Sequence, residues 1–443
     1  MEQTPQSPVK RTVRNRRVFY IPGYDPIHPR RYRELYRTES AAQSSISGYD
    51  IGITPKKGEH YGWRVESRMD GQSVDAQVEV LVWSDIVRNS MASTIPATYL
   101  QLVRTAFIYI GSGALRRLMW LRKGPVIAAL YPVGMLLLQF LVAVLLGLLA
   151  GKVFGWTLTS GARALIGLIG NGDATDLNFS TLYAGRMVAQ WAVGAWIAFM
   201  ILRWFKKKDG KIFAYYLMHD YAYAAQSKGA NPPELEDRMA NFRRAISAAL
   251  DDDVDEVLVV GHSSGAHLAV SILADLIREG GVPKQGPALG FLSLGQVVPM
   301  VSFLPKADRL RADLHYLSSR DELTWVDVTA PGDGCAFALC DPVAVSGVAP
   351  DGQKWPLVIS AAFTQTLSPE RWKELRWKFF RLHFQYLCAF DRVGYYDYFS
   401  ITAGPQTLAD RFAGRAPSKS RIDVAASKFT SMNYDPAKTP LTS

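Results

Sequence analysis

The stretch VDEVLVVGHSSGAHLAVSILADLI, residues 254–277, decides how this chain folds. It opens with a continuous apolar run, which is typical of a strand buried on both faces of a parallel sheet. The pentapeptide GHSSG, residues 261–265, follows, and after it the apolar residues recur with helical spacing. Because the chain turns so sharply from strand to helix, the stretch predicts an α/β fold with a mostly parallel sheet flanked by helices.

The turn itself predicts an unusual backbone position for one serine. Gly261 and Gly265 are expected there because side chains at those positions would collide with the tightly turning chain. The turn leaves the hydroxyl of Ser263 exposed at the start of a helix, where the helix dipole and free N–H groups favour developing negative charge. The ring of His262, within the turn, is expected to point away from the serine. Ser263 is therefore the candidate nucleophile.

With a strand before it and a helix after it, GHSSG resembles the nucleophile elbow of the α/β-hydrolase superfamily, which includes lipases, esterases and thioesterases. The resemblance covers about residues 17–90 and 210–400. Only the elbow is specific, and the rest depends on the order of the expected strands. The resemblance implies a serine nucleophile followed along the chain by an acid and then by a histidine base.

That order selects among the seven histidines of the chain, because His315 and His383 follow the elbow. His383, in FFRLHFQYL, comes after the last expected strand, where the resemblance places the base. A histidine packed among aromatic side chains is the alternative interpretation. His267 lies on the helix after the elbow, where packing is expected. A serine hydroxyl needs such a base to remove its proton, so His383 is the predicted base.

The acid orients the imidazole and stabilises its positive form. The stretch LTWVDVTAPGDGCAF, residues 323–337, supplies a strand, a Pro-Gly turn and then Asp333. An aspartate just beyond a strand end fits this role, so Asp333 is the first choice. Asp341 is the second choice because it precedes a proline and also fits a plain turn. Asp327 falls within the strand itself.

An oxyanion hole needs two N–H donors aimed at the developing negative oxygen. Ser264, directly after the nucleophile, is the expected first donor. The second is expected from VFYIPGYD, residues 18–25, where Gly23 lets the backbone approach closely and Tyr24 supplies the N–H. A plain Pro-Gly turn is the alternative. The stretch departs from the superfamily, which usually has His-Gly where this chain has Pro-Gly.

Two apolar segments in the middle of the chain are candidates for membrane spans. Residues 124–151 contain no charge, and a helix needs about 20 apolar residues to cross the hydrocarbon core. The segment 187–205 is shorter and carries one arginine near its end. We expect spans at about 125–150 and 187–205. A buried helical hairpin of a soluble domain is the alternative.

Basic residues flank the outer ends of this expected hairpin. Before the first span stand Arg116, Arg117, Arg122 and Lys123, after the second stand Arg203, Lys206, Lys207, Lys208 and Lys211, and between them only Lys152, Arg163 and Arg186. The positive-inside rule then indicates an integral protein of the inner (cytoplasmic) membrane with its catalytic domain in the cytoplasm. The net charge of +10 fits an anionic membrane surface, and the three cysteines without a C-x-x-C pair fit a reducing compartment.

The expected organisation has five parts. They are a flexible basic leader, 1–16; a first part of the α/β-hydrolase domain, 17–90; a membrane region, 91–210; a second part of the domain with the elbow, 211–403; and a flexible tail, 404–443. The membrane hairpin is thus inserted between an early strand and the helix that leads to the elbow.

These features predict a membrane-embedded serine hydrolase that cleaves an ester or thioester of an acyl or lipid substrate through an acyl-enzyme. Acyl transfer to an alcohol uses the same groups. No phosphate-loop or zinc-protease motif occurs, and we expect no cofactor, no metal and no nucleic-acid partner. The alternative is a catalytically inactive α/β-hydrolase fold that serves as a membrane scaffold or lipid-binding protein. The sequence assigns no oligomeric state.

Overall fold

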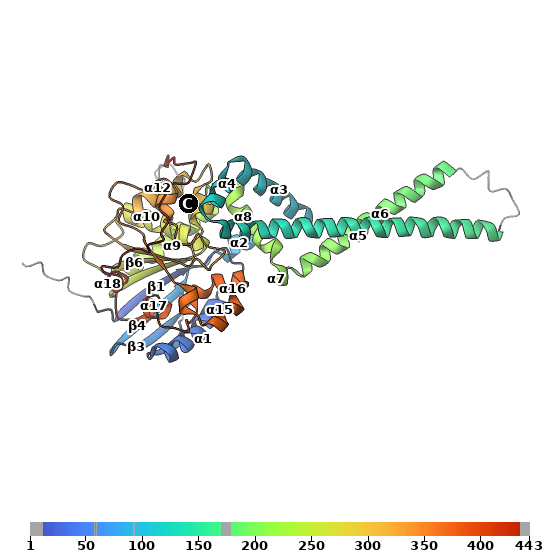
Figure 1. Cartoon of the computed structure of the whole chain (residues 1–443). Helices are drawn as coiled ribbons and strands as arrows, with labels where there is room; N and C mark the ends of the chain where they lie inside the picture. The colour runs from blue at the N-terminus through green and yellow to red at the C-terminus, as the bar shows by residue number, and fades with distance from the viewer. Residues whose placement is uncertain (1–11, 57, 59, 92–93, 170–178, 435–443) are drawn as a thin grey trace, which may run out of the picture. The chain divides into compact units, whose positions relative to one another are not determined.

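The computed structural model describes residues 12–56, 58, 60–91, 94–169 and 179–434 (Figure 1). The chain forms two compact units. The sheet unit comprises Met1–Met91, Arg104–Ala128 and Ala222–Ser443, and the helical unit comprises Ala92–Val103 and Ala129–Tyr221. Residues 104–128, which we expected in the membrane region, therefore pack with the sheet.

The sheet unit is built on eight strands in the order β2-β3-β4-β1-β5-β6-β7-β8. The neighbouring pairs β4–β1, β1–β5, β5–β6, β6–β7 and β7–β8 are parallel, whereas β2–β3 and β3–β4 are antiparallel. The prediction of an α/β fold with a mostly parallel sheet is confirmed. The strands are β1 (Asn15–Ile21), β2 (Asp50–Lys56), β3 (Gly62–Met69), β4 (Gln72–Val80), β5 (Glu256–His262), β6 (Ala288–Leu294), β7 (Thr324–Thr329) and β8 (Leu357–Ser360).

Helices cover both faces of this sheet (Figure 1). On one face lie α9 (Pro233–Leu250) and α10 (Ser264–Arg278), with α12 (Asp308–Leu317) packed against α10. On the other face lie α1 (Arg30–Ser47), α15 (Pro369–Leu375), α16 (Phe379–His383) and α17 (Tyr398–Ala403). The apolar residues of α9 recur at spacings of three and four, and the side of the helix that they form is buried.

The remaining helices of the two units vary widely in length. They are α2 (Ser84–Ser90), α3 (Ile95–Gly111), α4 (Ala114–Leu121), α5 (Lys123–Ile169), α6 (Phe179–Lys207), α7 (Asp209–Ile212), α8 (Ala214–Gln226), α11 (Val298–Ser302), α13 (Pro342–Val345), α14 (Phe363–Thr366), the 3₁₀ turn η1 (Gln385–Leu387) and α18 (Leu408–Arg411).

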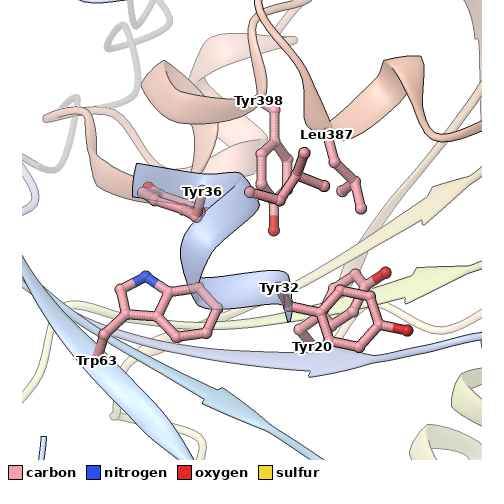
Figure 2. A pocket seen from close by; sticks show the side chains of 7 residues that line it. Tyr20, Tyr32, Tyr36, Trp63, Leu387 and Tyr398 are labelled. Carbon is pink, nitrogen blue, oxygen red and sulfur yellow. The ribbon is translucent and has the colours of Figure 1, made fainter. Parts of the chain in front are cut away.

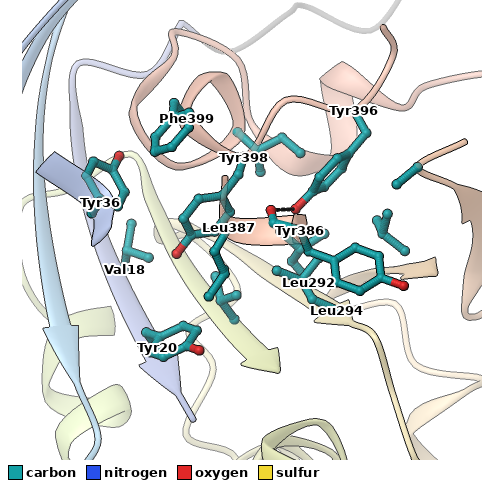
Figure 3. Packing of buried hydrophobic residues seen from close by; sticks show 14 of the residues in the cluster. Val18, Tyr20, Tyr36, Leu292, Leu294, Tyr386, Leu387, Tyr396, Tyr398 and Phe399 are labelled. Carbon is teal, nitrogen blue, oxygen red and sulfur yellow. Dashed lines mark hydrogen bonds between the residues drawn. The ribbon is translucent and has the colours of Figure 1, made fainter. Parts of the chain in front are cut away.

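An aromatic core lies between the sheet and the segment that follows α16 (Figure 3). Tyr386 and Tyr398 pack against apolar residues of β1 and β6. The hydroxyl of Tyr396 donates a hydrogen bond of 2.6 Å to the carbonyl of Tyr386, drawn in Figure 3. These contacts hold the segment directly after His383 against the sheet.

The same region contains a small cavity lined mainly by aromatic rings (Figure 2). Its volume of about 10 Å³ is close to what a single water molecule occupies. It is therefore too small for an acyl substrate. The lining residues are Tyr20, Tyr32, Leu35, Tyr36, Trp63, Leu387 and Tyr398.

Both expected flexible ends are held in their described parts, so these two predictions are wrong there. Val13 is buried, and its N–H donates to the carbonyl of Pro405 at 2.9 Å. Ile422 exchanges backbone hydrogen bonds with the segment at residues 339–341. The polar composition of the tail hid these contacts, because backbone groups make most of them. Residues 1–11 and 435–443 lie outside the described residues.

In the helical unit, α5 and α6 lie side by side as an antiparallel pair (Figure 1). The segments Lys123–Leu165 and Tyr183–Lys207 are long and apolar enough to cross a membrane, with 22% and 6% of their most apolar windows buried. Apolar helices this exposed do not fit the buried hairpin of a soluble domain. A Cβ on Gly147 would lie only 2.5 Å from the carbonyl oxygen of Gly194, so small residues let the two helices approach closely.

Candidate active site

Ser263 occupies the turn between β5 and α10 with φ +56° and ψ −122°. A non-glycine residue adopts positive φ only when its surroundings impose it. Here the Ser263 N–H donates to the carbonyl of Leu294 at 2.9 Å. A Cβ on Gly265 would lie 2.1 Å from the carbonyl oxygen of Ile21, and one on Gly261 would lie 2.8 Å from the Cα of Ala266. The sheet and the helix therefore leave no room for a side chain at position 261 or 265.

The loop after β1 passes directly beside the serine. A Cβ on Gly23 would lie 3.0 Å from the Cβ of Ser263 and 3.4 Å from its Oγ. The indole N–H of Trp83 donates to the carbonyl of Pro22 at 2.9 Å, which fixes the peptide plane before Gly23. Ser264 is the first residue of α10, where backbone N–H groups have no partner within the helix.

The side chain of Tyr24 is held on α2 rather than at the serine. Its hydroxyl lies 2.7 Å from Oγ of Ser90, and its ring packs edge-on against Trp83. The side chain of Tyr24 therefore takes no part in the oxyanion role that the sequence predicted for its N–H. A side chain at position 23 would crowd Ser263, because its Cβ would lie only 3.0 Å from the Cβ of Ser263.

The predicted acid and base lie together. Nδ1 of His383 donates to Oδ2 of Asp333 at 2.7 Å, and the same oxygen accepts the hydroxyl of Tyr386 at 3.0 Å. Oδ1 accepts the N–H of Cys335 at 2.9 Å. Burial acts to raise the pKa of Asp333, but the neighbouring His383 and these hydrogen bonds outweigh it and hold the pKa below its ordinary value. Asp333 is therefore an ionised carboxylate.

His262 connects the turn at Ser263 to the backbone of His383. Its Nε2 lies 3.0 Å from the carbonyl oxygen of His383, and the two rings are 4.9 Å apart. Burial, with the nearby His383, lowers the pKa of His262 to about 3. A neutral ring facing a carbonyl carries its proton on that nitrogen, so His262 donates this hydrogen bond. The elbow thereby holds the backbone of His383 in place.

Ser263 and His383 both lie beside the turn that follows β6, at Leu294 and Gly295. The N–H of Ser263 is bonded to Leu294, and a Cβ on the next residue, Gly295, would lie 3.1 Å from Cε1 of His383. Both residues are thus at the carboxyl edge of the parallel strands. Within the described chain no hydrogen bond joins the Ser263 hydroxyl to His383. In resting enzymes such bonds are often long and tighten when substrate binds.

The other acidic candidates have structural roles. Oδ1 of Asp341 accepts the N–H groups of Val343 and Ala344 at 3.0 and 3.1 Å and so caps α13. Asp327 lies within β7 as predicted, and its Oδ1 accepts the hydroxyl of Ser293 at 2.5 Å. Burial raises the pKa of Asp327 to about 8. The structure thus brings Asp333, and not Asp341, to His383.

The remaining candidate histidines are also accounted for. Nδ1 of His315 lies 2.8 Å from the carbonyl oxygen of Val348 on another part of the chain. His267 is partly buried on α10, and burial lowers its pKa to about 4.

Cys335 lies beside the acid and the base. Ligand atoms of Asp333, Cys335 and His383 lie within 4.8 Å of one another, a spacing that could hold a metal ion. Both carboxylate oxygens and Nδ1 of His383 are already engaged in the hydrogen bonds described above. The donor set therefore fits an oriented imidazole better than a metal centre.

The chain around the start of α5 contacts the loop that carries Asp333, which we call the acid loop. Nε of Arg122 donates to the carbonyl of Ala338 at 2.9 Å, and a Cβ on Gly124 would lie 3.6 Å from the Cα of Gly334. On its other side this loop meets α16, because a Cβ on Gly334 would lie 3.1 Å from the ring of Phe379. The acid loop is therefore held between α16 and the beginning of the first candidate span.

Comparisons with known proteins give no match among protein-family models, curated proteins or solved structures. The functional argument consequently depends on the geometry of the site.

Sequence reasoning did not single out Tyr386 or Trp83, and it named Arg122 only as a basic residue before the first span. Tyr386 follows His383 by three residues in the same short helical stretch, and this spacing was a usable signal. Trp83 and Arg122 act on parts of the chain distant in sequence, and no local pattern marks them.

Proposed function

We propose that this chain is a membrane-bound serine hydrolase that cleaves an ester or thioester of an acyl or lipid substrate. The observation that carries the proposal is the hydrogen bond between Asp333 and His383, formed at the same sheet edge as a serine held at positive φ. A serine, an imidazole and an ionised carboxylate are the groups that acyl transfer needs. Nothing in ordinary packing requires these three together.

In the proposed reaction, His383 removes the proton from the Ser263 hydroxyl through Nε2 while Oγ attacks the substrate carbonyl carbon. The carbonyl oxygen becomes an oxyanion, which the N–H groups of Ser264 and Tyr24 stabilise. The tetrahedral intermediate collapses, and His383 returns the proton to the leaving alcohol or thiol. Water, deprotonated by the same imidazole, then hydrolyses the acyl-serine. Asp333 stabilises the imidazolium in both halves.

A lipid-like substrate is favoured by the surroundings of the acid loop. The loop contacts Gly124 at the start of α5, a helix long and apolar enough to cross a membrane. Trp377 is 73% exposed and its ring packs against Phe379, which itself covers the acid loop. An apolar rim beside the beginning of a span suits an acyl chain that enters from the bilayer. The catalytic part is then on the cytoplasmic side, as the basic flanks indicate.

A fluorophosphonate probe tests the chemistry, since it reacts with an activated serine whatever the natural substrate is. We expect labelling of the purified full-length protein, loss of labelling in Ser263→Ala, and retention in Ser45→Ala, which removes an exposed hydroxyl of α1. Folded wild-type protein that takes up no probe would support the inactive membrane scaffold instead.

A further inference from the structure

A second cavity lies on the sheet unit, away from the residues proposed for catalysis. Its volume is about 380 Å³, and it is lined by Arg116, Arg117 and Trp120 of α4 and by Ala425 and Ala426 of the C-terminal segment. Cavities of roughly 300–1,000 Å³ are typical of sites for small molecules. We propose that this cavity binds the phosphate headgroup of an anionic phospholipid.

The charged residues that line the cavity are two arginines, Arg116 and Arg117. Nη1 of Arg117 donates to the carbonyl of Ala426 at 2.9 Å, which fixes the guanidinium and leaves its other donors for a ligand. Arg116 is exposed on the same helix. In the described part of the chain neither arginine forms an ion pair with a carboxylate. A guanidinium offers planar paired donors that match the oxygens of a phosphate, so two of them in one cavity indicate an anion of that chemistry.

The apolar side chains around the cavity indicate a lipid as the source of that phosphate. Trp120, which lines the cavity, is 69% exposed. Large rings this exposed are costly in water but favourable at the boundary between headgroups and acyl chains, where tryptophan is enriched. A site for a soluble phosphate ester would not need them.

The position of α4 in the chain supports the same assignment. The helix ends at Leu121, and α5 begins at Lys123. Basic residues directly before a membrane span lie at the level of anionic headgroups. The C-terminal segment is fixed beside the cavity because the N–H of Ala426 donates to the carbonyl of Val345 at 2.9 Å. This inference rests on the proposed membrane insertion and not on the proposed hydrolysis.

Native mass spectrometry of the detergent-solubilised full-length protein tests the proposal. The measurements use the Ser263→Ala background, so that turnover of lipid cannot alter the result. We expect phosphatidylglycerol to bind about tenfold or more tightly than phosphatidylcholine, which corresponds to the loss of one or two charge-assisted contacts. Arg116→Gln combined with Arg117→Gln should remove this preference. Arg244→Gln, an exposed arginine on α9, is the matched control and should keep it.

Three outcomes would overturn the assignment. They are equal affinity for the two lipids in the parent protein, a preference that persists in the double arginine variant, and a preference that inorganic phosphate abolishes while binding this cavity as tightly as the lipid does. The last would assign the cavity to soluble phosphate. Circular dichroism and gel filtration establish that each variant is folded. Fluorophosphonate labelling of the protein that retains Ser263 reports separately on the proposed hydrolysis.

Discussion

Oδ2 of Asp333 lies 2.7 Å from Nδ1 of His383, although 50 residues separate them in the chain. The carboxylate is buried, so it has lost its hydration and depends on its three hydrogen-bond donors. The fold thus joins an aspartate after a Pro-Gly turn and a histidine among aromatic residues in one hydrogen-bonded pair.

Asp333→Asn should reduce the rate of fluorophosphonate labelling by roughly 10³- to 10⁴-fold, as loss of the acid does in hydrolases with a Ser-His-Asp triad. An amide cannot stabilise the imidazolium, and it favours the wrong tautomer of His383. The second-order labelling rate is the measurement. Asp341→Asn is the matched control, because asparagine also caps helices and should preserve both α13 and the rate. Slow labelling of Asp341→Asn together with normal labelling of Asp333→Asn would make Asp341 the acid instead.

Tyr386→Phe should lower the labelling rate by about fivefold or more and destabilise the fold by about 1–3 kcal/mol. The variant removes one donor from Asp333 and leaves the N–H of Ala330, now bonded to the hydroxyl at 3.0 Å, without an acceptor. With one donor fewer, the pKa of Asp333 should rise, so the rate should begin to fall at a higher pH as the solution is acidified. Tyr396→Phe, which loses only a bond to a backbone carbonyl, should leave the pH profile unchanged. Identical profiles for all three proteins would limit Tyr386 to packing.

Gly265→Ala should destabilise the sheet unit by more than about 4 kcal/mol or prevent folding. The added methyl group would lie 2.1 Å from the carbonyl oxygen of Ile21, which belongs to β1 and cannot move without disrupting the sheet. Thermal unfolding measures the effect. Gly111→Ala has open space around the new methyl group and should change the melting temperature little. A stable, normally labelled Gly265→Ala protein would contradict this description of the elbow.

Asp327→Asn should stabilise the protein most at high pH. The pKa of Asp327 is raised by burial to about 8, above its unfolded value of about 3.9, and Oδ2 has no partner among the described residues. Between these values the folded state binds the extra proton, so wild-type stability falls as the pH rises toward 8. The gain in melting temperature on substitution should therefore be larger at pH 9 than at pH 5.

Asp85→Asn is the control with the opposite sign. Its hydrogen bond with Arg238 lowers the pKa of Asp85 to about 2, so its contribution is present at neutral pH and lost on acidification. Because this pair is largely exposed, the loss should stay below about 1 kcal/mol. Equal temperature shifts at both pH values for Asp327→Asn would contradict the assigned pKa.

The topology of the hairpin can be measured with single introduced cysteines and an impermeant maleimide, in a background without the native thiols. Ser160→Cys, beyond the span expected at about 125–150, should react in intact cells, because the proposed topology places the residues between the spans outside. Ser45→Cys, on α1 of the sheet unit, should react only after the membrane is opened. Reaction of Ser45→Cys in intact cells would place the proposed active site outside.

Local patterns predicted a large part of this structure. The strand and the helix expected around GHSSG form as β5 and α10, the turn between them forms where expected, and Asp327 falls within a strand as expected. In each case the information lies within a dozen or so residues, because periodicity and steric limits on a turn act over that distance. The edge strand β2 was missed, since its pattern is weakly buried and contains a proline.

Tertiary structure decided which of the remaining candidates meet. Asp333 and Asp341 were both compatible with the sequence, and only the folded chain brings the first to His383 and uses the second to cap a helix. The tail at 404–434 reads as polar and loose, yet backbone hydrogen bonds hold it on the sheet unit. The physical reason is the same for both. A strand, a helix or a tight turn is specified by neighbours along the chain, whereas a hydrogen bond between distant residues depends on where the whole core places them.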